Sequence, residues 1–321
     1  MKLSIVVSMY NTANQITDCL ESLHNVEVKD AEFLIINDGS TDDSQKIVED
    51  YLKNTSDERF KSFNNSNHGV SYTRNFGIKH AQGDYIIFVD SDDQLVDDFD
   101  YFEAIKKMDN CELDMMETAF EVLKDEKATF PMQDLNSNVQ EGISLFNRDY
   151  SVNGSFWTNV WHFIFRRSFL EKSNLFFKDY IYLEDTLWMI EVLRKTKRAV
   201  YFNQVLYIYK VRGNSITAST SRDSMIKKYQ ILKRVIQDCF DVLGSGSEWA
   251  VMESYIVKTF IREMVIFTAL GVSTKESYTD VRPILKKRRL GMVDKLKVAI
   301  LSLPDSIKIP ICKALYKKIK L

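Results

Sequence analysis

The sequence is poor in the features that mark linkers, leader segments and membrane spans. It has only 4 Pro and 11 Gly among 321 residues, which argues against long flexible connections between domains. No window approaches the roughly 18 apolar residues that a membrane-spanning helix needs. The first ten residues lack a basic region, a long apolar stretch and a small-residue cleavage site, so no signal peptide is predicted. We therefore expect a cytoplasmic protein.

Cysteine is scarce too, and its positions carry no metal or redox motif. Cys19, Cys111, Cys239 and Cys312 are scattered, with no CxxC pair and no neighbouring histidine. This usage is typical of packed thiols in a reducing compartment. The net charge is only -2, so nothing in the overall charge favours a nucleic-acid partner.

Charge is nevertheless unevenly distributed along the chain. Residues 286–321 hold 11 Lys and Arg against 2 Asp and Glu, a net of +9, whereas the rest of the chain carries -11. Within this tail Val293, Leu296 and Ile300 fall on one helical face. Basic amphipathic helices bind anionic membranes, so the tail predicts peripheral attachment to the inner face of the cell membrane. Packing of the tail on the body, or against a second copy of the chain, is the alternative.

The first third of the chain alternates two hydrophobic periodicities. Short, continuously apolar runs predict buried strands, and amphipathic segments between them predict helices. This pattern implies a parallel sheet covered on both faces. The expected strands are 3–7, 32–36 and 85–89, and the expected helices are 14–24, 40–52 and 69–81.

The remainder is less regular and then becomes helical. We expect a strand at 113–122, a polar loop at 124–142, a helix from about Glu184 and a strand at 205–211. The pattern beyond Asp223 predicts helices, which are listed here with their breaks: 224–243, 247–270, and short pieces interrupted by Pro304 and Pro310.

Polar residues follow each predicted strand of the first third, at 8–11, 37–40 and 90–93. Open α/β sheets bind ligands at the carboxyl ends of their strands, so these three segments are expected to share a site. The last segment, "DSDD", places three carboxylates within four positions, and these repel one another unless a cation cancels the charge. Mg²⁺ or Mn²⁺ held by one or two carboxylates and substrate phosphates is a recurring arrangement. The alternative is a solvated turn that caps a helix beginning near Asp97.

These segments, taken in order, resemble the family 2 glycosyltransferases of the GT-A fold. The matching stretches are "SMYN", "INDGSTDDS", "NHGVSYTRNFGIKHAQGDYIIFVDSDD", "NVWHFIFRRSFLEKSNLFF", "YLEDTLW" and "VLYIYKVRGNSIT". The likeness covers about 1–110 and 155–220. It implies a Rossmann-like, mostly parallel sheet flanked by helices, with a helical C-terminal region. In these terms 1–220 is the catalytic domain, with a nucleotide-binding half at 1–110 and an acceptor half at 111–220, and 221–321 is the helical region.

The resemblance also implies a nucleotide-sugar donor, for which a UDP-sugar is expected. Tyr10 and Asp38 would hold the base of the nucleotide. Asn67, Gly69 and Arg74 would shape the wall beside the diphosphate. On its own, Arg74 would more often be a surface cation, but near an acidic loop it can hold that loop or contact a phosphate.

The stretch Asp90, Ser91 and Asp92 is similar to the DxD motif of the family. The resemblance makes Asp92 the principal ligand of Mn²⁺ or Mg²⁺ and places Asp90, a second metal ligand, nearer the ribose or sugar. Position 8 is a departure, because it is Ser8 where the family commonly has proline, although its hydroxyl can still offer a polar contact. Arg212 lies in a segment with which the family often covers the diphosphate.

Glu184 and Asp185 open a predicted helix. Two acids at a helix start can simply complement the helix dipole. The family, however, has an ED motif at this place, and its aspartate usually acts as the base. By resemblance Asp185 is the catalytic base, and Glu184 contacts the acceptor or the sugar. A single displacement would then invert the anomeric centre.

The expected activity is that of a metal-dependent, inverting hexosyl- or N-acetylhexosaminyltransferase in cell-surface polysaccharide assembly, with a glycan or lipid-linked acceptor. A non-catalytic homologue that only binds nucleotide or carbohydrate is one alternative, but it would be expected to have lost Asp92 or Asp185. A phosphatase of the haloacid dehalogenase type also places DxD after a strand, but it usually carries Thr or Val where this chain has Gln94. A Rossmann dehydrogenase would need GxGxxG after the first strand, which is absent.

Overall fold

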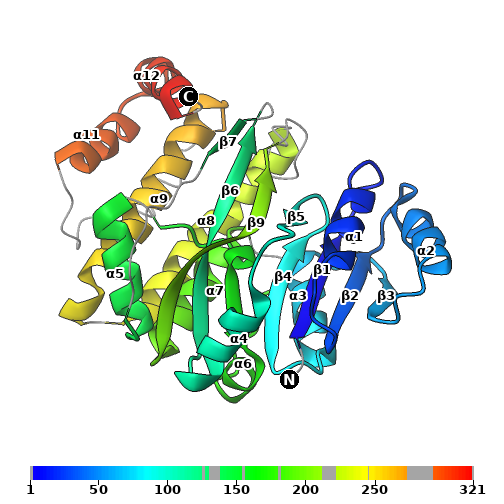
Figure 1. The fold of residues 1–321 in the computed structure, drawn as a ribbon. Helices are drawn as coiled ribbons and strands as arrows, with labels where there is room; N and C mark the ends of the chain where they lie inside the picture. Colours follow the sequence, from blue (N-terminus) through cyan, green and yellow to red (C-terminus); the bar gives the residue numbers. More distant parts are fainter. Residues whose placement is uncertain are drawn as a thin grey trace. The chain divides into compact units, whose positions relative to one another are not determined.

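A computed structural model describes most of the chain (Figure 1). The described residues are 3–124, 127–129, 138–153, 156–179, 182–211, 222–244, 246–272 and 292–319. The chain divides into two compact units, Met1–Arg212 and Gly213–Leu321. The assignment of a nucleotide-binding half and an acceptor half within the first unit stays a prediction.

A mixed sheet of nine strands organises the described part of the first unit. The strand order is β3-β2-β1-β4-β8-β6-β9-β5, with β7 paired to β6. The four strands β3, β2, β1 and β4 are parallel, whereas β8 is antiparallel to β4 and β6. The strands are β1 (Leu3–Met9), β2 (Ala31–Asp38), β3 (Phe60–Asn65), β4 (Tyr85–Asp90), β5 (Gln94–Leu95), β6 (Met115–Lys124), β7 (Lys127–Thr129), β8 (Phe163–Arg166) and β9 (Ala199–Lys210).

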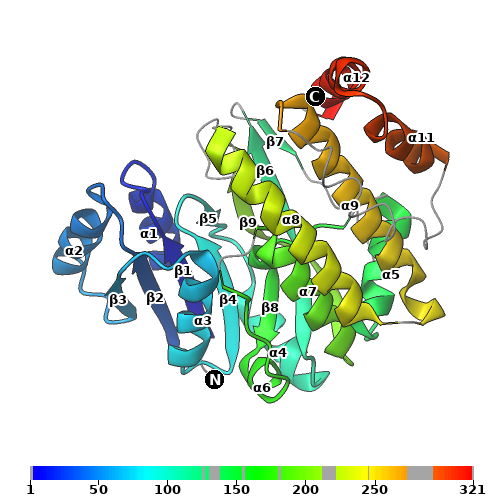
Figure 2. The same ribbon diagram turned by 180° about the vertical axis from the view of Figure 1, so that it is seen from behind.

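Helices cover both faces of the parallel half of this sheet. Figure 1 shows α1 in front of it and Figure 2, from behind, shows α3 on the other face. The close approach of α3 depends on Gly77, because a Cβ at this position would lie 2.2 Å from Cγ1 of Val6 on β1. The helices of this unit are α1 (Ile16–His24), α2 (Ser44–Asn54), α3 (Val70–His80), α4 (Tyr101–Asn110), α5 (Gly142–Asn153), the 3₁₀ helix η1 (Val160–His162), α6 (Arg167–Lys172) and α7 (Glu184–Lys195).

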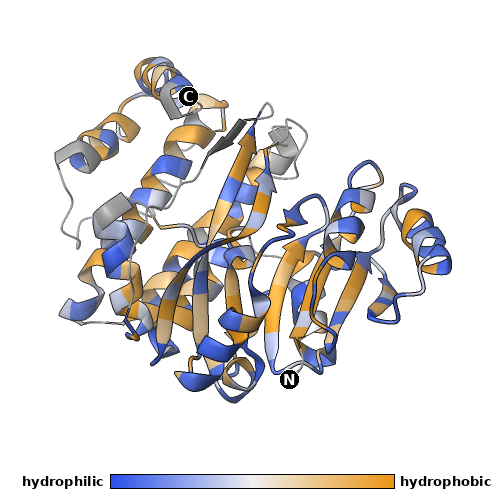
Figure 3. Ribbon diagram, viewed as in Figure 1, coloured by the Kyte–Doolittle hydropathy of each residue, from blue (hydrophilic) through white to orange (hydrophobic). Residues whose placement is uncertain are grey.

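The hydrophobic pattern explains the central strands. The apolar runs 5–7 of β1, 33–36 of β2 and 85–89 of β4 are buried on both faces, as strands between two helical layers require. Figure 3 shows this hydrophobic colouring along the central strands and a mixed colouring on the helix α2. The expected strands and the expected amphipathic helices of the first third are therefore present.

The structure corrects several boundaries. β3 was not predicted, because its sequence FKSFNN is mostly polar; it pairs with β2 only and lies at the end of the sheet. α4 begins at Tyr101 rather than near Asp97, and the Asp100 side chain caps it by accepting from the Glu103 backbone N–H at 2.9 Å. β9 begins at Ala199, earlier than the predicted strand at 205–211.

The described part of the second unit is helical. α9 (Ala250–Ala269) follows the 3₁₀ helix η3 (Ser247–Trp249) and contacts α8 (Arg222–Leu243), α11 (Met292–Leu301) and α12 (Asp305–Ile319). Figure 2 shows α8 beside α9. Within the described residues no helix is both long and apolar enough to cross a membrane.

Proline positions in this unit gave one correct and one wrong prediction. The helix does stop before Pro304, between α11 and α12. The expected break at Pro310 is wrong, because α12 continues through it. A proline inside a helix leaves the carbonyl four residues earlier without its N–H partner. Here that residue is Ser306, which is exposed, so water can satisfy its carbonyl.

Three ionisable side chains are buried together inside the first unit. They are Glu117 on β6, Asp149 on α5 and His162 in η1, and Oε1 of Glu117 lies 3.6 Å from Nε2 of His162. Burial lowers the pKa of His162 to about 3, so this contact is not a salt bridge at neutral pH. Burial, and then the charge of Asp149, raise the pKa of Glu117. The folded protein therefore favours a protonated Glu117.

This burial predicts a pH-dependent effect of Glu117→Gln. The pKa of Glu117 is raised above 4.5 in the folded protein, so its contribution to the free energy of unfolding is fully present below pH 4.5. That contribution is lost as the pH rises through the pKa of the folded state, because an unpaired charge must then be buried. Glutamine carries no such charge, so at pH 8 the variant should unfold at a higher urea concentration than the wild type. The difference should shrink toward pH 4.5. Glu121→Gln, on the same strand but partly exposed, is the control, and a pH-independent difference for Glu117→Gln would contradict the prediction.

Candidate active site

The polar segments after β1, β2 and β4 meet at the carboxyl edge of the sheet and are joined by hydrogen bonds. The Asn11 side chain accepts from the Thr41 backbone N–H at 2.8 Å. Oγ1 of Thr12 lies 2.9 Å from Oγ of Ser91, and the Ser91 backbone N–H donates to the Ser8 carbonyl at 3.1 Å. Each of the three loops is thus held by at least one of the others.

Asp38, the last residue of β2, organises the loop that precedes α3. It is only 4% exposed, and its two carboxylate oxygens accept from the backbone N–H groups of His68 and Gly69, each at 2.8 Å. The next residue, Gly39, has φ +70, and a Cβ there would lie 2.7 Å from the Asn67 backbone nitrogen. Only glycine permits this approach without strain. Asp38 therefore fixes the predicted diphosphate wall, with Asn67 exposed on it.

The three aspartates after β4 have different environments. Asp90 and Asp92 are partly exposed at the edge. Asp93 is buried, and its oxygens accept from the Tyr207 hydroxyl at 2.9 Å and from the Lys210 backbone N–H at 2.8 Å. Burial, and then the charges of Asp92 and Asp90, raise the pKa of Asp93 to about 8. Asp93 anchors the acidic turn to β9, a role that the sequence did not predict.

Arg74 joins this edge to the start of α7. The side chain comes from the middle of α3 and is 3% exposed. Its Nη2 donates to Asp90 at 3.1 Å, and its Nη1 donates to Glu184 at 3.2 Å and also to Asp185. Burial alone would lower the pKa of Arg74, but the charges of the three carboxylates raise it above its ordinary value. The guanidinium therefore stays charged inside the protein.

The start of α7 presents two acids from an unusual backbone conformation. Leu183 is left-handed, with φ 62 and ψ 36, which costs on the order of 1–2 kcal/mol for a residue with a side chain. Glu184 and Asp185 follow in the first helical turn, where the helix dipole favours negative charge. Burial raises the pKa of both carboxyls, and the charge of Arg74 opposes this rise.

A second set of contacts fixes α7 against α3 without charge. The Asn75 side chain donates to the Phe177 carbonyl at 2.7 Å and accepts from the Phe177 N–H at 2.8 Å. The ring of Phe177 stacks on Trp188 of α7 with centroids 4.3 Å apart. Phe88 of β4 meets both rings edge-on. These contacts place the start of α7 beside α3.

Most of the predicted site residues thus lie at one edge of the sheet or on the loop held to it. The Tyr10 side chain is partly buried there, beside the loop that contains Asn11. Arg212 lies outside the described residues. The contact between Arg74 and the acids of α7 was not predicted, because nothing in the local pattern links a helix interior to a distant helix start.

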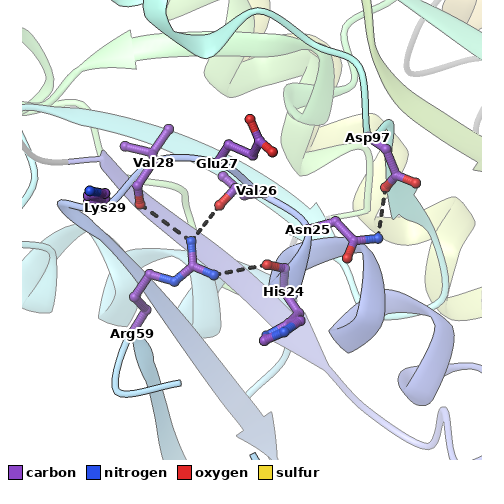
Figure 4. A pocket seen from close by; sticks show the side chains of 8 residues that line it. All are labelled: His24, Asn25, Val26, Glu27, Val28, Lys29, Arg59 and Asp97. Atoms are coloured by element: carbon purple, nitrogen blue, oxygen red, sulfur yellow. Dashed lines mark hydrogen bonds between the residues drawn. The ribbon is translucent and has the colours of Figure 1, made fainter. Parts of the chain in front are cut away.

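A hollow lies elsewhere, on the opposite edge, where the chain enters β2 and β3. It is lined by residues 24–29, Arg59 and Asp97. Figure 4 shows that the Arg59 guanidinium points toward the segment 24–29 and donates to the carbonyl oxygens of His24, Val26 and Val28. Arg59 also pairs with Asp57 at 2.6 Å. The N–H groups of Arg59 thus bond to the protein itself, and we assign this hollow a structural role and no ligand.

Comparison with known proteins shows the family to which the chain belongs. The model of the family "Glycosyl transferase family 2" matches residues 4–173, more than half of the chain. The chain belongs to this family. The predicted family, and the prediction that the protein is a glycosyltransferase, are therefore confirmed.

One relative of this family 2 glycosyltransferase is the glycosyltransferase EpsJ of Bacillus subtilis (strain 168). The two are 31% identical over 307 residues, which cover 94% of this chain and 86% of EpsJ. The likeness extends beyond the family model into the helical second unit.

Two solved structures share the fold of this family 2 glycosyltransferase. S. aureus TarS 1-349 in complex with UDP-GlcNAc superposes with a TM-score of 0.67 at 17% identity, covering 98% of this chain and 92% of that one. The mannosyltransferase PcManGT from Pyrobaculum calidifontis, in complex with GDP-Man and Mn²⁺, gives 0.56 at 14% identity, covering 98% and 87%. The predicted GT-A fold with a helical C-terminal region is confirmed.

The acidic edge of the family 2 glycosyltransferase fits a hard divalent cation. Asp90 and Asp92 offer carboxylate oxygens, and Mg²⁺ or Mn²⁺ commonly takes only one or two of these beside substrate phosphates. Ser8, opposite Asp90 in the register of β1 and β4, has a buried hydroxyl without a hydrogen-bond partner among the described residues. In the same described part of the chain, no cluster of three or more His, Cys, Asp or Glu is arranged for a metal. Two carboxylates leave further coordination positions of such a cation to the oxygens of a ligand.

The role of Asp38 predicts the effect of Asp38→Asn. The amide keeps one acceptor oxygen but turns an N–H₂ group toward the second buried backbone N–H. An unsatisfied buried donor costs about 1–3 kcal/mol, so the free energy of unfolding should fall by that amount in urea titrations. The neighbouring Asp43 is exposed and makes no capping hydrogen bond, so Asp43→Asn is the matched control. Equal stability of the two variants would show that Asp38 does not fix the loop.

Proposed function

We propose that this glycosyltransferase transfers a hexosyl or N-acetylhexosaminyl group from a nucleotide sugar, expected to be a UDP-sugar, to a glycan or lipid-linked acceptor in cell-surface polysaccharide biosynthesis. The transfer inverts the anomeric centre and uses Mn²⁺ or Mg²⁺. TarS, which shares the fold, is known in complex with UDP-GlcNAc, and PcManGT in complex with GDP-Man and Mn²⁺. These complexes motivate the donor class and the metal.

One observation carries the proposal. A single guanidinium, that of Arg74, touches both Asp90 at the donor edge and Asp185 at the start of α7. The two carboxylates assigned to the donor and to the base are therefore neighbours in space. A sugar held by its diphosphate at the edge would lie within reach of a base on α7, which is what direct displacement needs.

In the proposed reaction Asp185 accepts the proton of the acceptor hydroxyl while the hydroxyl oxygen bonds to the anomeric carbon. The bond from that carbon to the diphosphate oxygen breaks, and the nucleoside diphosphate leaves with the electron pair. A divalent cation held by Asp92 and Asp90 would neutralise the charge that develops on the diphosphate. Glu184 lies beside Asp185 and contacts the acceptor or the sugar.

We assign donor binding to residues of the hydrogen-bonded loops after β1, β2 and β4 and of the loop before α3. Tyr10 and Asp38 hold the nucleotide base, with Asp38 acting largely through the loop that it fixes. Asn67 and Gly69 form the wall beside the diphosphate. Ser8 offers a polar contact to the donor, and Ser91 lies between Asp90 and Asp92 in the donor-binding turn, with its hydroxyl 2.9 Å from that of Thr12. Arg212 is proposed to cover the diphosphate.

Two variants of the acidic groups separate donor binding from transfer. Asp92→Asn should lose the Mn²⁺-dependent stabilisation by a nucleoside diphosphate, because it removes the principal metal ligand. Asp185→Asn should keep that stabilisation but lose transfer by about 100-fold or more, because the base is gone. The measurements are melting temperatures with UDP, GDP and dTDP with and without Mn²⁺, since ligand stabilisation follows affinity, and release of nucleotide from the matching sugars.

Each variant serves as the control of the other. Near-normal transfer by Asp185→Asn would remove it from the base role. Unchanged Mn²⁺ dependence in Asp92→Asn would remove the metal assignment. Donor binding by the wild type without transfer to any acceptor would favour the non-catalytic alternative.

We also propose that the C-terminal tail binds an anionic membrane surface. Leu296 on α11 is 62% exposed, Leu303 after it 37% and Ile307 on α12 49%. The three side chains belong to one stretch, 296–307, which runs from α11 through the turn before Pro304 into the start of α12. Exposed lysines flank them, including Lys295 and Lys313. Apolar side chains rimmed by lysine suit the interface of an anionic bilayer.

Vesicle sedimentation tests this surface. Leu296→Ser combined with Ile307→Ser should weaken binding to vesicles of phosphatidylglycerol and phosphatidylcholine, by about 1.5 kcal/mol or more for each side chain that enters the interface. Substitutions are preferable to truncation, because α12 packs on α9. Phe102→Ser removes a 78% exposed aromatic from α4 and is the control. Equal sedimentation of all three proteins would exclude membrane binding through this face.

A further inference from the structure

We propose that Arg74 is a positioning residue for the reaction. It holds Asp185 and Asp90 with one guanidinium and so fixes the base relative to the donor edge. This inference rests on the proposed function, because that function assigns Asp185 as the base and Asp90 to the donor site. The sequence placed Arg74 beside the diphosphate, whereas the structure directs its side chain to the acids of α7.

The geometry of the contact requires a guanidinium. Nη1 serves the two acids of α7 and Nη2 serves Asp90, so opposite arms of one rigid plane address two different elements. A planar fork fixes both distance and direction between its two partners. A lysine ammonium is a single point on a flexible stem and cannot fix two carboxylates in this way.

Charge gives the contact its strength. Asp90, Glu184 and Asp185 are three carboxylates at one place, and at most 32% of any of these side chains is exposed. Without a cation between them they would repel one another or take up protons. Arg74 supplies that cation, and the ring of Phe177 lies 5.4 Å from its guanidinium carbon. The surroundings therefore hold the guanidinium in one orientation.

The position of α7 does not depend on Arg74 alone. The hydrogen bonds between Asn75 and Phe177, and the stacking of Phe177 on Trp188, dock the helix without any charge. Substitution of Arg74 is therefore expected to leave α7 attached to α3. The substitution should instead change the position of the Asp185 carboxylate relative to that of Asp90. This relative position matters for the proposed transfer, because the sugar would lie between the donor edge and the base.

Arg74→Lys tests this inference. Because a misplacement of about 1 Å can cost about 100-fold in rate, kcat should fall by roughly that factor. The dissociation constant of UDP with Mn²⁺, measured by calorimetry, should change by less than threefold. In the Asp185→Asn background the same substitution should lower kcat no further, because residues that act through one group are not additive.

Two further variants guard against a purely structural effect. Arg59→Lys alters another largely buried arginine, at the opposite edge, and should lower the melting temperature without lowering kcat. Arg74→Gln removes the charge but keeps an N–H donor, so it should also lower kcat while keeping donor binding. This second variant keeps the test decisive if Arg74→Lys does not fold.

The outcomes are distinguishable. A kcat for Arg74→Lys within threefold of the wild type, with Asp185→Asn inactive, overturns the inference and leaves the proposed function standing. A parallel loss of donor affinity and rate overturns it too, because Arg74 would then be a donor ligand. An additive loss in the double variant has the same consequence. Full activity of Asp185→Asn overturns both proposals.

Discussion

The site depends on one positive charge, which lies among three carboxylates that would otherwise repel one another. The Arg74 guanidinium lies inside the first unit, against Asp90 from the sheet edge and against Glu184 and Asp185 from α7. Removing one member of such a buried group leaves the others uncompensated, so each holds the rest in place. The sheet edge and the helix start can be close together because a cation separates their acids.

The fold was largely predictable because hydrophobic periodicity decided it. Buried parallel strands are mostly apolar, and β1, β2 and β4 each contain a run of consecutive apolar residues. β3 escaped prediction because a strand at the end of a sheet needs few apolar residues, and it has only Phe60 and Phe63. The helix through Pro310 also escaped, because a local rule about proline cannot see that Ser306 faces water.

The site was predictable only in part. The rule that ligands bind at carboxyl strand ends gave the edge, and family motifs gave the candidate residues. Neither gave a role to Asp93, which is buried against Tyr207 while the adjacent Asp92 stays partly exposed. Likewise, the local sequence of α3 gives no sign that Arg74 reaches Asp185. Such pairings depend on how helices pack against one another, and this cannot be deduced from the sequence of one segment.

The hydrogen bonds that join the loops after β1, β2 and β4 have a thermodynamic consequence. Asn11 bonds with Thr41, Thr12 with Ser91, and Asp38 with the loop before α3, so hydrogen bonds within the protein already join the rim formed by these loops. A flexible rim would lose conformational freedom on each encounter and weaken the complex accordingly. Here the conformational entropy of these loops is lost when the protein folds. Changing a single contact at this rim should therefore alter the affinity for a ligand without altering the shape of the rim.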